Sequence, residues 1–388
     1  MENAITADNI PMMGHTTFTV GGTPKQPINL SLTRLAAKVN LRVKNAIPAI
    51  FRPDKVTVHN IPKFILLDGS AETEPLATEN YSRMEAVQKE DGSYTFYIPQ
   101  NKRGIQAGLS LPSEKGGSNV PPRSTYIRVR GNYKHAVWGW VPFFYRIYPG
   151  ANMYNDFNIE QNKQYNIGIT LTGTNDNDKR VYPPQDLSID ADGNPATANS
   201  YIVLEEGRAY FFDATVQGNG ATTPGKDEVA GAKWYGPKIE PRKMSPKNAF
   251  WIWKTDEALI DEVTLSSKKD KVFFVIGDDV INGNALIGIQ EEGTPEGEVA
   301  WSWHIWKSDE DDDPRENPDP HRVRDNTNGS FESTNANWTR AGTVEYLMTR
   351  SLGSYSKKWT PHNHMYYQWG RKDPLYLKSH GSLTIKLI

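Results

Sequence analysis

The sequence contains no cysteine, and its 388 residues hold no long apolar run. The lack of cysteine excludes disulfide bridges, thiol nucleophiles and cysteine-ligated zinc, although it does not fix the cellular compartment. No segment approaches the ~20 apolar residues that a membrane-spanning helix needs, and no long segment repeats apolar residues at the helical period of about 3.6. We therefore expect neither a transmembrane span nor a helical fold.

The chain also lacks an excess of charge of either sign. It has 44 Lys and Arg residues against 46 Asp and Glu residues, which gives a formal net charge of -2, and the basic residues are scattered. Proteins that bind nucleic acid gather Lys and Arg in a patch or stripe. Nucleic acid is therefore not an expected partner.

Catalytic motifs are missing as well. The sequence has no Gly-x-Ser-x-Gly turn, and its acidic residues are too numerous and too evenly spread to single out a carboxylate pair. We predict that the protein is not an enzyme and that it has no catalytic residue, no cofactor and no metal.

Three groups of residues imitate metal sites. They are the acidic run at residues 309–313, the set Asp190, Asp192 and Asn194, and the pair His362 and His364. The first has no glycine-centred loop, the second has Pro195 where a calcium loop needs glycine, and the third has no identifiable third ligand. We interpret all three as polar turns or loops without a metal.

What the sequence does contain is typical of an all-β protein. It has 31 Gly and 26 Pro residues, and Tyr, Trp, Phe, Thr and Val recur in short runs between them. Around residues 34–43, Leu35, Ala37 and Val39 alternate with Arg34 and Lys38, which predicts a strand buried on one face. Further strands are predicted at residues 55–59, 94–98, 126–133, 143–148, 164–171, 201–204, 209–216, 250–253, 271–276, 285–289, 299–306, 343–349 and 382–387.

The spacing of these strands predicts tandem antiparallel β-sandwiches of the transthyretin or immunoglobulin type, with an irregular β-rich module at the C-terminal end. Between residues 173 and 200 the composition changes to Thr, Asn, Asp, Pro and Gly, which indicates a linker. The expected domains are a remnant of a preceding N-terminal domain (1–29), a first sandwich (30–173), a linker (174–198), a second sandwich (199–306) and the C-terminal module (307–388).

Aromatic residues are dense in two phrases, WSWHIW at residues 301–306 and YYQWGRKDP at residues 366–374. Flat apolar rings with a polar edge can stack on sugars, but in a β-sandwich they more often fill the core. The candidate ligand platform comprises Trp301, Trp303, Trp306, Tyr366, Tyr367 and Trp369. Core packing is the first interpretation of these residues and surface recognition the second.

The order of several phrases resembles the fimbrillin-like pilins of Bacteroidales. They are LTRLAAKV (32–39), FYIPQNKRG (96–104), STYIRV (124–129), YRIYPG (145–150), DFNI (156–159) and NKQY (162–165). Downstream, ANSYIV (198–203), QGNG (217–220), GNALI (283–287) and WSWHIW resemble the extra domains of large, tip-type members. YYQWGRKDP is similar to a module of secreted Bacteroidetes and Fibrobacter proteins, where an Arg-Asn-Leu-Gly phrase precedes it; here Ser351 replaces the Asn.

The resemblance implies a non-enzymatic pilus subunit, a tip or accessory adhesin, that assembles with other pilin subunits by β-strand donation. It implies a place on the cell surface, in the fimbrium at the outer membrane, and export as a lipoprotein precursor. Since no signal segment begins at Met1, we expect a truncated or fragmentary chain. Host or bacterial surface glycans or proteins are the expected adhesion ligands.

Two rival functions stay open. A carbohydrate-binding module of a polysaccharide-utilisation system would use the same aromatic residues as its platform, and exposed coplanar tryptophans would favour it. An enzyme in the last module would need a cleft around His362, His364, Arg371 and Asp373. If these aromatic residues are core residues, we expect Arg371 to bond a carboxylate or backbone carbonyls and to fix the turn at Gly370, while Tyr366 and Trp369 pack inside the last module.

Overall fold

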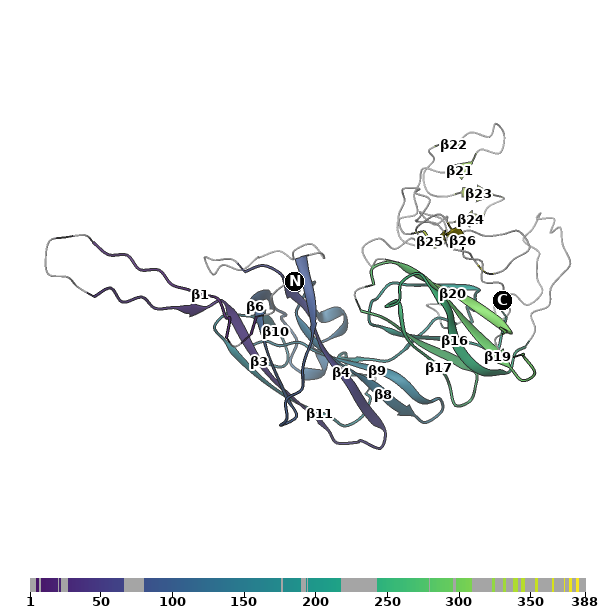
Figure 1. Cartoon of the computed structure of the whole chain (residues 1–388), viewed down its shortest axis with the longest axis horizontal. Helices are drawn as coiled ribbons and strands as arrows, with labels where there is room; N and C mark the ends of the chain where they lie inside the picture. The colour runs from purple at the N-terminus through teal and green to yellow at the C-terminus, as the bar shows by residue number, and fades with distance from the viewer. Residues whose placement is uncertain are drawn as a thin grey trace. The chain divides into compact units, whose positions relative to one another are not determined.

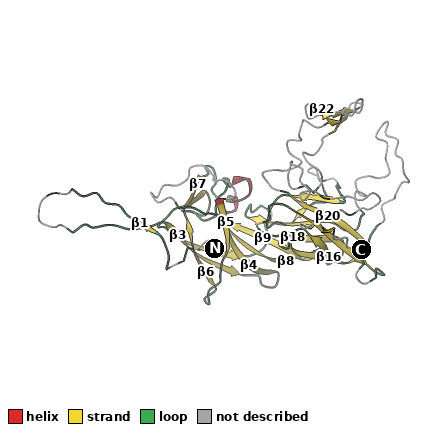
Figure 2. Cartoon of the chain, turned by 45° about the horizontal axis from the view of Figure 1, so that its top comes forward, coloured by secondary structure: helices red, strands yellow, loops and turns green. Residues whose placement is uncertain are grey.

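The computed structural model describes most of the first 308 residues. The described ranges are 5–6, 8–19, 21, 27–65, 80–175, 177–189, 193, 195–217, 243–278, 280–295 and 298–308, followed by single residues and short strands. Strands dominate them (Figure 2), and the helical turns among them are the 3-10 turns Pro112–Glu114 and Gly117–Asn119. The prediction of an all-β protein is confirmed. Within the described ranges, no helix has the length and apolar character needed to cross a bilayer.

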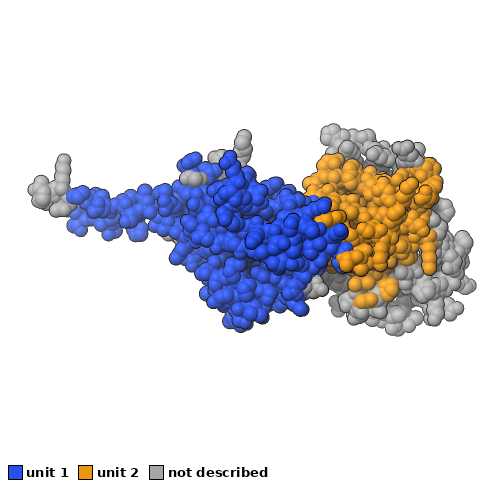
Figure 3. All heavy atoms as spheres, turned by 90° about the horizontal axis from the view of Figure 1, so that it is seen from below, with its two compact units in different colours: residues 1–135, 142–183 blue, residues 136–141, 184–388 orange. Residues whose placement is uncertain are grey.

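The chain divides into two compact units, coloured in Figure 3. Unit 1 comprises residues 1–135 and 142–183, and unit 2 comprises residues 136–141 and 184–388. The change from unit 1 to unit 2 at residue 184 falls inside the segment predicted as a linker. Most of the predicted C-terminal module, residues 307–388, lies outside the described residues, so the predicted domain limits stay predictions.

Unit 1 contains two main sheets, β11-β3-β6 and β12-β9-β8-β4-β5, and the smaller pairs β10-β7 and β1-β2 (Figure 1). Its strands are β1 (Met12–Met13), β2 (Thr33–Arg34), β3 (Ala36–Asn45), β4 (Phe51–Pro62), β5 (Tyr81–Glu85), β6 (Ser93–Pro99), β7 (Asn101–Ile105), β8 (Tyr126–His135), β9 (Gly139–Ile147), β10 (Asp156–Ile159), β11 (Gln164–Leu171) and β12 (Val181–Tyr182). The predicted strand at residues 164–171 has the same limits as β11.

The core of unit 1 lies between its two main sheets. Leu35, Ala37, Val39 and Leu41 are almost completely buried, whereas Arg34 and Arg42 are exposed. Val39 and Leu41 belong to one apolar cluster with residues of β4, β8 and β9, which lie in the other sheet. The predicted alternation is confirmed, because a slip of one residue would have buried the basic side chains instead.

Unit 2 is a second two-sheet sandwich, with the sheets β13-β15-β18-β17 and β14-β20-β19-β16. Its strands are β13 (Gln185–Asp186), β14 (Ser200–Val203), β15 (Ala209–Asp213), β16 (Pro246–Lys254), β17 (Ile260–Leu265), β18 (Lys271–Ile276), β19 (Gly283–Glu291) and β20 (Trp301–Lys307). A second apolar cluster joins residues of both sheets, including Phe212, Phe274, Ile287 and Trp303.

Short strand pairs follow β20 in the sequence. They are β21 (Val323–Arg324) with β22 (Phe331–Glu332), β23 (Trp338–Arg340) with β24 (Thr343–Glu345), and β25 (Leu377–Lys378) with β26 (Ser382–Leu383). The predicted strands at 343–349 and 382–387 overlap β24 and β26.

Most strand pairs are antiparallel, as predicted, but three pairs are parallel: β11 with β3, β13 with β15, and β14 with β20. In each of these pairs the first-named strand forms the end of its sheet. Parallel neighbours require a long crossover rather than a tight hairpin. The sheets are therefore completed by strands that lie far away in the sequence.

Candidate functional site

The tryptophan phrase WSWHIW forms most of β20. Trp303 and Trp306 are completely buried, and Trp301 is partly buried. Trp303 packs against Phe212, with 4.7 Å between the ring centroids, and belongs to the core of unit 2. Neither Trp303 nor Trp306 presents a ring face to solvent.

The other half of the candidate platform, Tyr366, Tyr367 and Trp369, lies outside the described residues. Their role in a ligand platform stays a prediction. Of the cleft proposed around His362, His364, Arg371 and Asp373, the structure describes Asp373 alone, which accepts a hydrogen bond from Ser302 Oγ at 2.6 Å.

The outer face of β19 and β20 carries buried polar side chains beside the buried Leu286 and Trp306. Asn284, Ser302 and His304 are each at most 2% exposed. Asn284 Nδ2 donates to the carbonyl of Gly353 at 2.9 Å, and Asn284 Oδ1 lies 2.8 Å from His304 Nε2. Because Oδ1 can only accept, Nε2 carries the proton of the imidazole. Gly353 thus bonds directly to β19, which is a central strand of its sheet.

Gly353 shows why this contact depends on one residue type. Its φ angle is +77°, and an added Cβ would lie 2.2 Å from Met365 Cγ and 2.9 Å from Asn284 Oδ1. Only glycine fits that position without moving its neighbours. Gly353 closes the Arg-Ser-Leu-Gly phrase, so this part of the phrase has a packing role.

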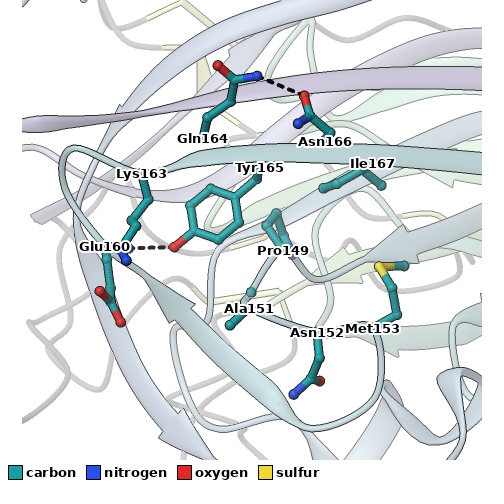
Figure 4. A pocket seen from close by; sticks show the side chains of 11 residues that line it. Pro149, Ala151, Asn152, Met153, Glu160, Lys163, Gln164, Tyr165, Asn166 and Ile167 are labelled. Carbon is teal, nitrogen blue, oxygen red and sulfur yellow. Dashed lines mark hydrogen bonds between the residues drawn. The ribbon is translucent and has the colours of Figure 1, made fainter.

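A cavity of about 290 Å³ lies in unit 1 beside the start of β11 (Figure 4). Residues 149–153 form one wall, and residues 160 and 163–167 form the other. Tyr165 and Ile167 are buried side chains of β11 on the cavity side, whereas Gln164 and Asn166 are exposed and point away from it (Figure 4). The cavity therefore borders the inner face of the sheet at its edge.

Tyr165 holds one end of the cavity. Its hydroxyl accepts a hydrogen bond from the backbone N–H of Glu160 at 2.8 Å and donates to the carbonyl of Asn158 at 3.1 Å. Burial raises the pKa of this phenol, so it stays protonated and can keep both bonds.

The opposite wall is held by Asn152 and Lys115. Asn152 Oδ1 accepts the backbone N–H groups of Tyr154 and Asn155 at 3.0 and 2.9 Å, which closes a tight turn. Lys115 is buried, and its Nζ donates to the carbonyl of Asn152 at 2.8 Å. Burial lowers the pKa of Lys115 to about 8. This wall is thus fixed before any ligand arrives.

Sequence reasoning did not identify the cavity. The wall residues 149–153 have no apolar periodicity, and the phrases YRIYPG and NKQY that flank them indicated only a family resemblance. The available signal was the asparagine-rich stretch from Asn152 to Asn155, which favours a side-chain-capped turn.

The arrangement can receive a strand. Among the described residues, β3 is the one strand that pairs with β11, so the other side of β11 has no partner strand there. An unpaired edge offers a row of backbone N–H and C=O groups to another extended segment. The adjacent cavity offers space for the inward side chains of that segment.

Among the described residues, no three His, Asp or Glu side chains come together as a metal site. The acidic run at 309–313, the set Asp190, Asp192 and Asn194, and the pair His362 and His364 all lie outside the described residues.

Comparison with known proteins identifies one family. Residues 96–169 match the family described as "Domain of unknown function (DUF4906)". The match covers less than half of the chain but includes every residue that lines the cavity. No curated protein matches the chain.

Two solved pilin structures are distant likenesses of this chain. The major pilin from Streptococcus pyogenes is 10% identical, covering 71% of this chain and 98% of its own, with a TM-score of 0.12. The major pilin T-13 of the same species is 8% identical over the same shares of the two chains, again with a TM-score of 0.12. At that TM-score the likenesses carry no argument about fold or function.

Proposed function

We propose that the protein is a non-enzymatic subunit of a cell-surface pilus, a tip or accessory adhesin assembled by β-strand donation. The series of fimbrillin-like phrases supports this proposal, and so does the all-β architecture. The observation that carries it is the edge of β11, which is unpaired among the described residues and borders a preformed cavity.

This geometry supports assembly by strand donation. Backbone hydrogen bonds along β11 would supply affinity without regard to sequence, and alternate side chains of the incoming strand would set the register. The exposed Gln164 and Asn166 keep the outer face of the sheet polar, while Tyr165 and Ile167 line the inner face. A strand with polar and apolar residues in alternation is therefore the expected ligand.

The proposal includes a location and partners. The subunit would be exported as a lipoprotein precursor, reach the outer membrane, join other pilin subunits and contact host or bacterial surface glycans or proteins. Immunogold labelling of producing cells with an antiserum against unit 1 should mark surface filaments. A sheared-cell fraction should contain the chain in high-mass polymers. Labelling confined to the cell interior, or a sheared fraction with monomers alone, would contradict the proposal.

The alternative, a carbohydrate-binding module, depends on Tyr366, Tyr367 and Trp369. We expect Trp369→Ala to cost about 3–5 kcal/mol of stability, as truncations of large core aromatics do. A Trp369→Ala protein with unchanged melting and lost glycan binding would instead favour the alternative. A polysaccharide-hydrolysis assay tests the third possibility, and turnover that disappears with one acidic residue would establish an enzyme.

A further inference from the structure

An extended arm joins β1 to β2 in unit 1 (Figure 1). The described parts of this arm are residues 14–19, 21 and 27–32. Its two segments lie side by side at the base, where Met12 pairs with Arg34 and a Cβ on Gly14 would lie 2.3 Å from the carbonyl oxygen of Ser31. The returning segment then enters the core at Leu35, which is 1% exposed.

The returning segment carries apolar side chains at every second position. Ile28, Leu30 and Leu32 are 56%, 50% and 58% exposed, and the polar Asn29 and Ser31 stand between them. In an extended chain, alternate side chains point to the same side, so three aliphatic groups form one stripe. A partner that covered these exposed aliphatic groups would gain stability, because apolar surface would leave water.

The edge of β11 has the complementary pattern. A strand placed beside β11 would align its inward side chains with Tyr165 and Ile167, on the side where the cavity lies. Its outward side chains would align with Gln164 and Asn166, which are exposed. The stripe of Ile28, Leu30 and Leu32 suits the first side, and Asn29 and Ser31 suit the second. Residues 27–33 carry no charge, so burying them requires no counter-ion.

The connection of the arm indicates that the edge belongs to another molecule. Only Leu35 separates β2 from β3, and β3 already pairs with one edge of β11. Because Leu35 is fixed in the core, the arm cannot reach the unpaired edge of β11 in its own molecule without passing around that strand.

We propose that residues 27–33 of one copy of this chain add as a strand beside β11 of a second copy, with Ile28, Leu30 and Leu32 directed at its cavity. This assignment rests on the proposed assembly by strand donation and names both the donated segment and its receiving site.

Because the natural chain has no cysteine, introduced cysteines can test the contact directly. One population carries Leu30→Cys, and a second, distinguished by a size tag, carries Ala151→Cys on the exposed cavity wall. Disulfides form only when the two Cα atoms come within about 7 Å. Mild oxidation of the mixture should give the mixed-size dimer in several-fold excess over the control mixture, in which Ser31→Cys replaces Leu30→Cys. Equal yields, or no dimer, would overturn the assignment.

A second measurement does not depend on cysteine. Leu30→Asp should weaken self-association in analytical ultracentrifugation by about tenfold or more, whereas Asn29→Asp, on the opposite side of the same arm, should leave it nearly unchanged. Circular dichroism verifies that both variants fold. Equal effects of the two substitutions would refute the stripe as the contact.

The pilus function and the arm assignment can be refuted independently of each other. Surface filaments without the Leu30–Ala151 cross-link would refute the arm assignment and leave the pilus function standing. The cross-link without surface filaments would establish the contact between copies and refute the pilus function.

Discussion

β3 in unit 1 and β20 in unit 2 are both alternating strands in sandwiches, but they are covered differently. In β3, the core side is buried, and the opposite side carries Lys38, Asn40 and Arg42 at the surface or partly exposed. In β20, six of the seven residues are buried, and the seventh, Trp301, is partly buried. Both strands pack one side against the core, so the difference lies in what covers the other side.

The outer sides of the two strands also differ in the way their polar groups find partners. On β3, Asn40 bonds Asn166 and Thr95, and Arg42 lies 3.7 Å from Asp91, all in places that water reaches. On β20, His304 bonds Asn284 in a fully buried position, and the buried Ser302 bonds Asp373, which is partly exposed. A buried polar group without a partner is costly, whereas an exposed one can bond water. The polar side chains of the two strands therefore contribute differently to stability.

The largest expected effect is on the core side of β20. Trp303→Ala should destabilise unit 2 by about 3–5 kcal/mol, because it removes a fully buried indole that packs on Phe212. Urea denaturation gives the free energy, and hydrogen exchange of peptides from 283–307 locates the loss. The matched control is Trp251→Ala, since Trp251 is 46% exposed. Similar losses for the two variants would show that Trp303 is not a core residue.

The next effect is a pH dependence specific to unit 1. Burial lowers the pKa of Lys115 from 10.5 to about 8, so between these values the unfolded chain holds a proton that the folded unit has lost. The free energy of unfolding should therefore rise with pH across this window, by about 3 kcal/mol in total. Pulse proteolysis in urea at pH 8 and 9.5 measures the part of this rise below the range where buried tyrosines titrate.

Lys115→Met should abolish that rise, and Lys102→Met should preserve it, because Lys102 is exposed. The upper pH limit matters because burial also raises the pKa values of Tyr145 and Tyr148, which opposes stability at still higher pH. A rise that persists in Lys115→Met would assign it to another group.

A smaller effect tests the covered outer side of β19 and β20, where Asn284 of β19 bonds His304 of β20. Asn284→Ala should cost about 1–3 kcal/mol, because it leaves His304 Nε2–H and the Gly353 carbonyl without their bond to Asn284. Asn40→Ala on β3 is the matched control, and water can replace its partners there. Urea denaturation of both variants should show the larger loss for Asn284. Equal losses would remove the distinction between the two outer faces.

The smallest effect is expected at the exposed side of β3. The Arg42 and Asp91 side chains are 70% and 60% exposed, so Arg42→Ala should change the unfolding free energy by less than about 0.5 kcal/mol. A loss comparable to that of Asn284→Ala would mean that something covers this side of β3 as well.

The sequence allowed much of the local structure to be predicted. The alternation from Leu35 to Leu41 predicted both β3 and its buried side. A similar alternation predicted β11 and an apolar run predicted β18, both with their observed limits. Strands without a strong apolar pattern were missed, among them β5, β10 and β17. The last of these begins Ile-Asp-Glu and has a weak alternation that many loops share.

Long-range arrangements could not be predicted in the same way. Alternation in WSWHIW predicts a strand with one buried side, but it contains no information that Gly353 and Asp373 meet the other side. The parallel strands at the ends of the sheets and the cavity beside β11 likewise depend on which distant segments pack together. Such meetings are decided by the packing of the whole unit rather than by the period of one strand.

The parallel pairing of β3 with β11 also bears on how unit 1 acquires its structure during synthesis. Asn40 and Asn166, which bond across this pair, are 126 positions apart. Closing so long a loop costs conformational entropy, and this cost must be offset before the strand pair contributes stability. Folds dominated by such contacts therefore form slowly. A ribosome has to deliver the chain through residue 171 before the three-stranded sheet can close. Until then β3 has β6 on one side and an open edge on the other, so the nascent unit must be kept from pairing with neighbouring chains.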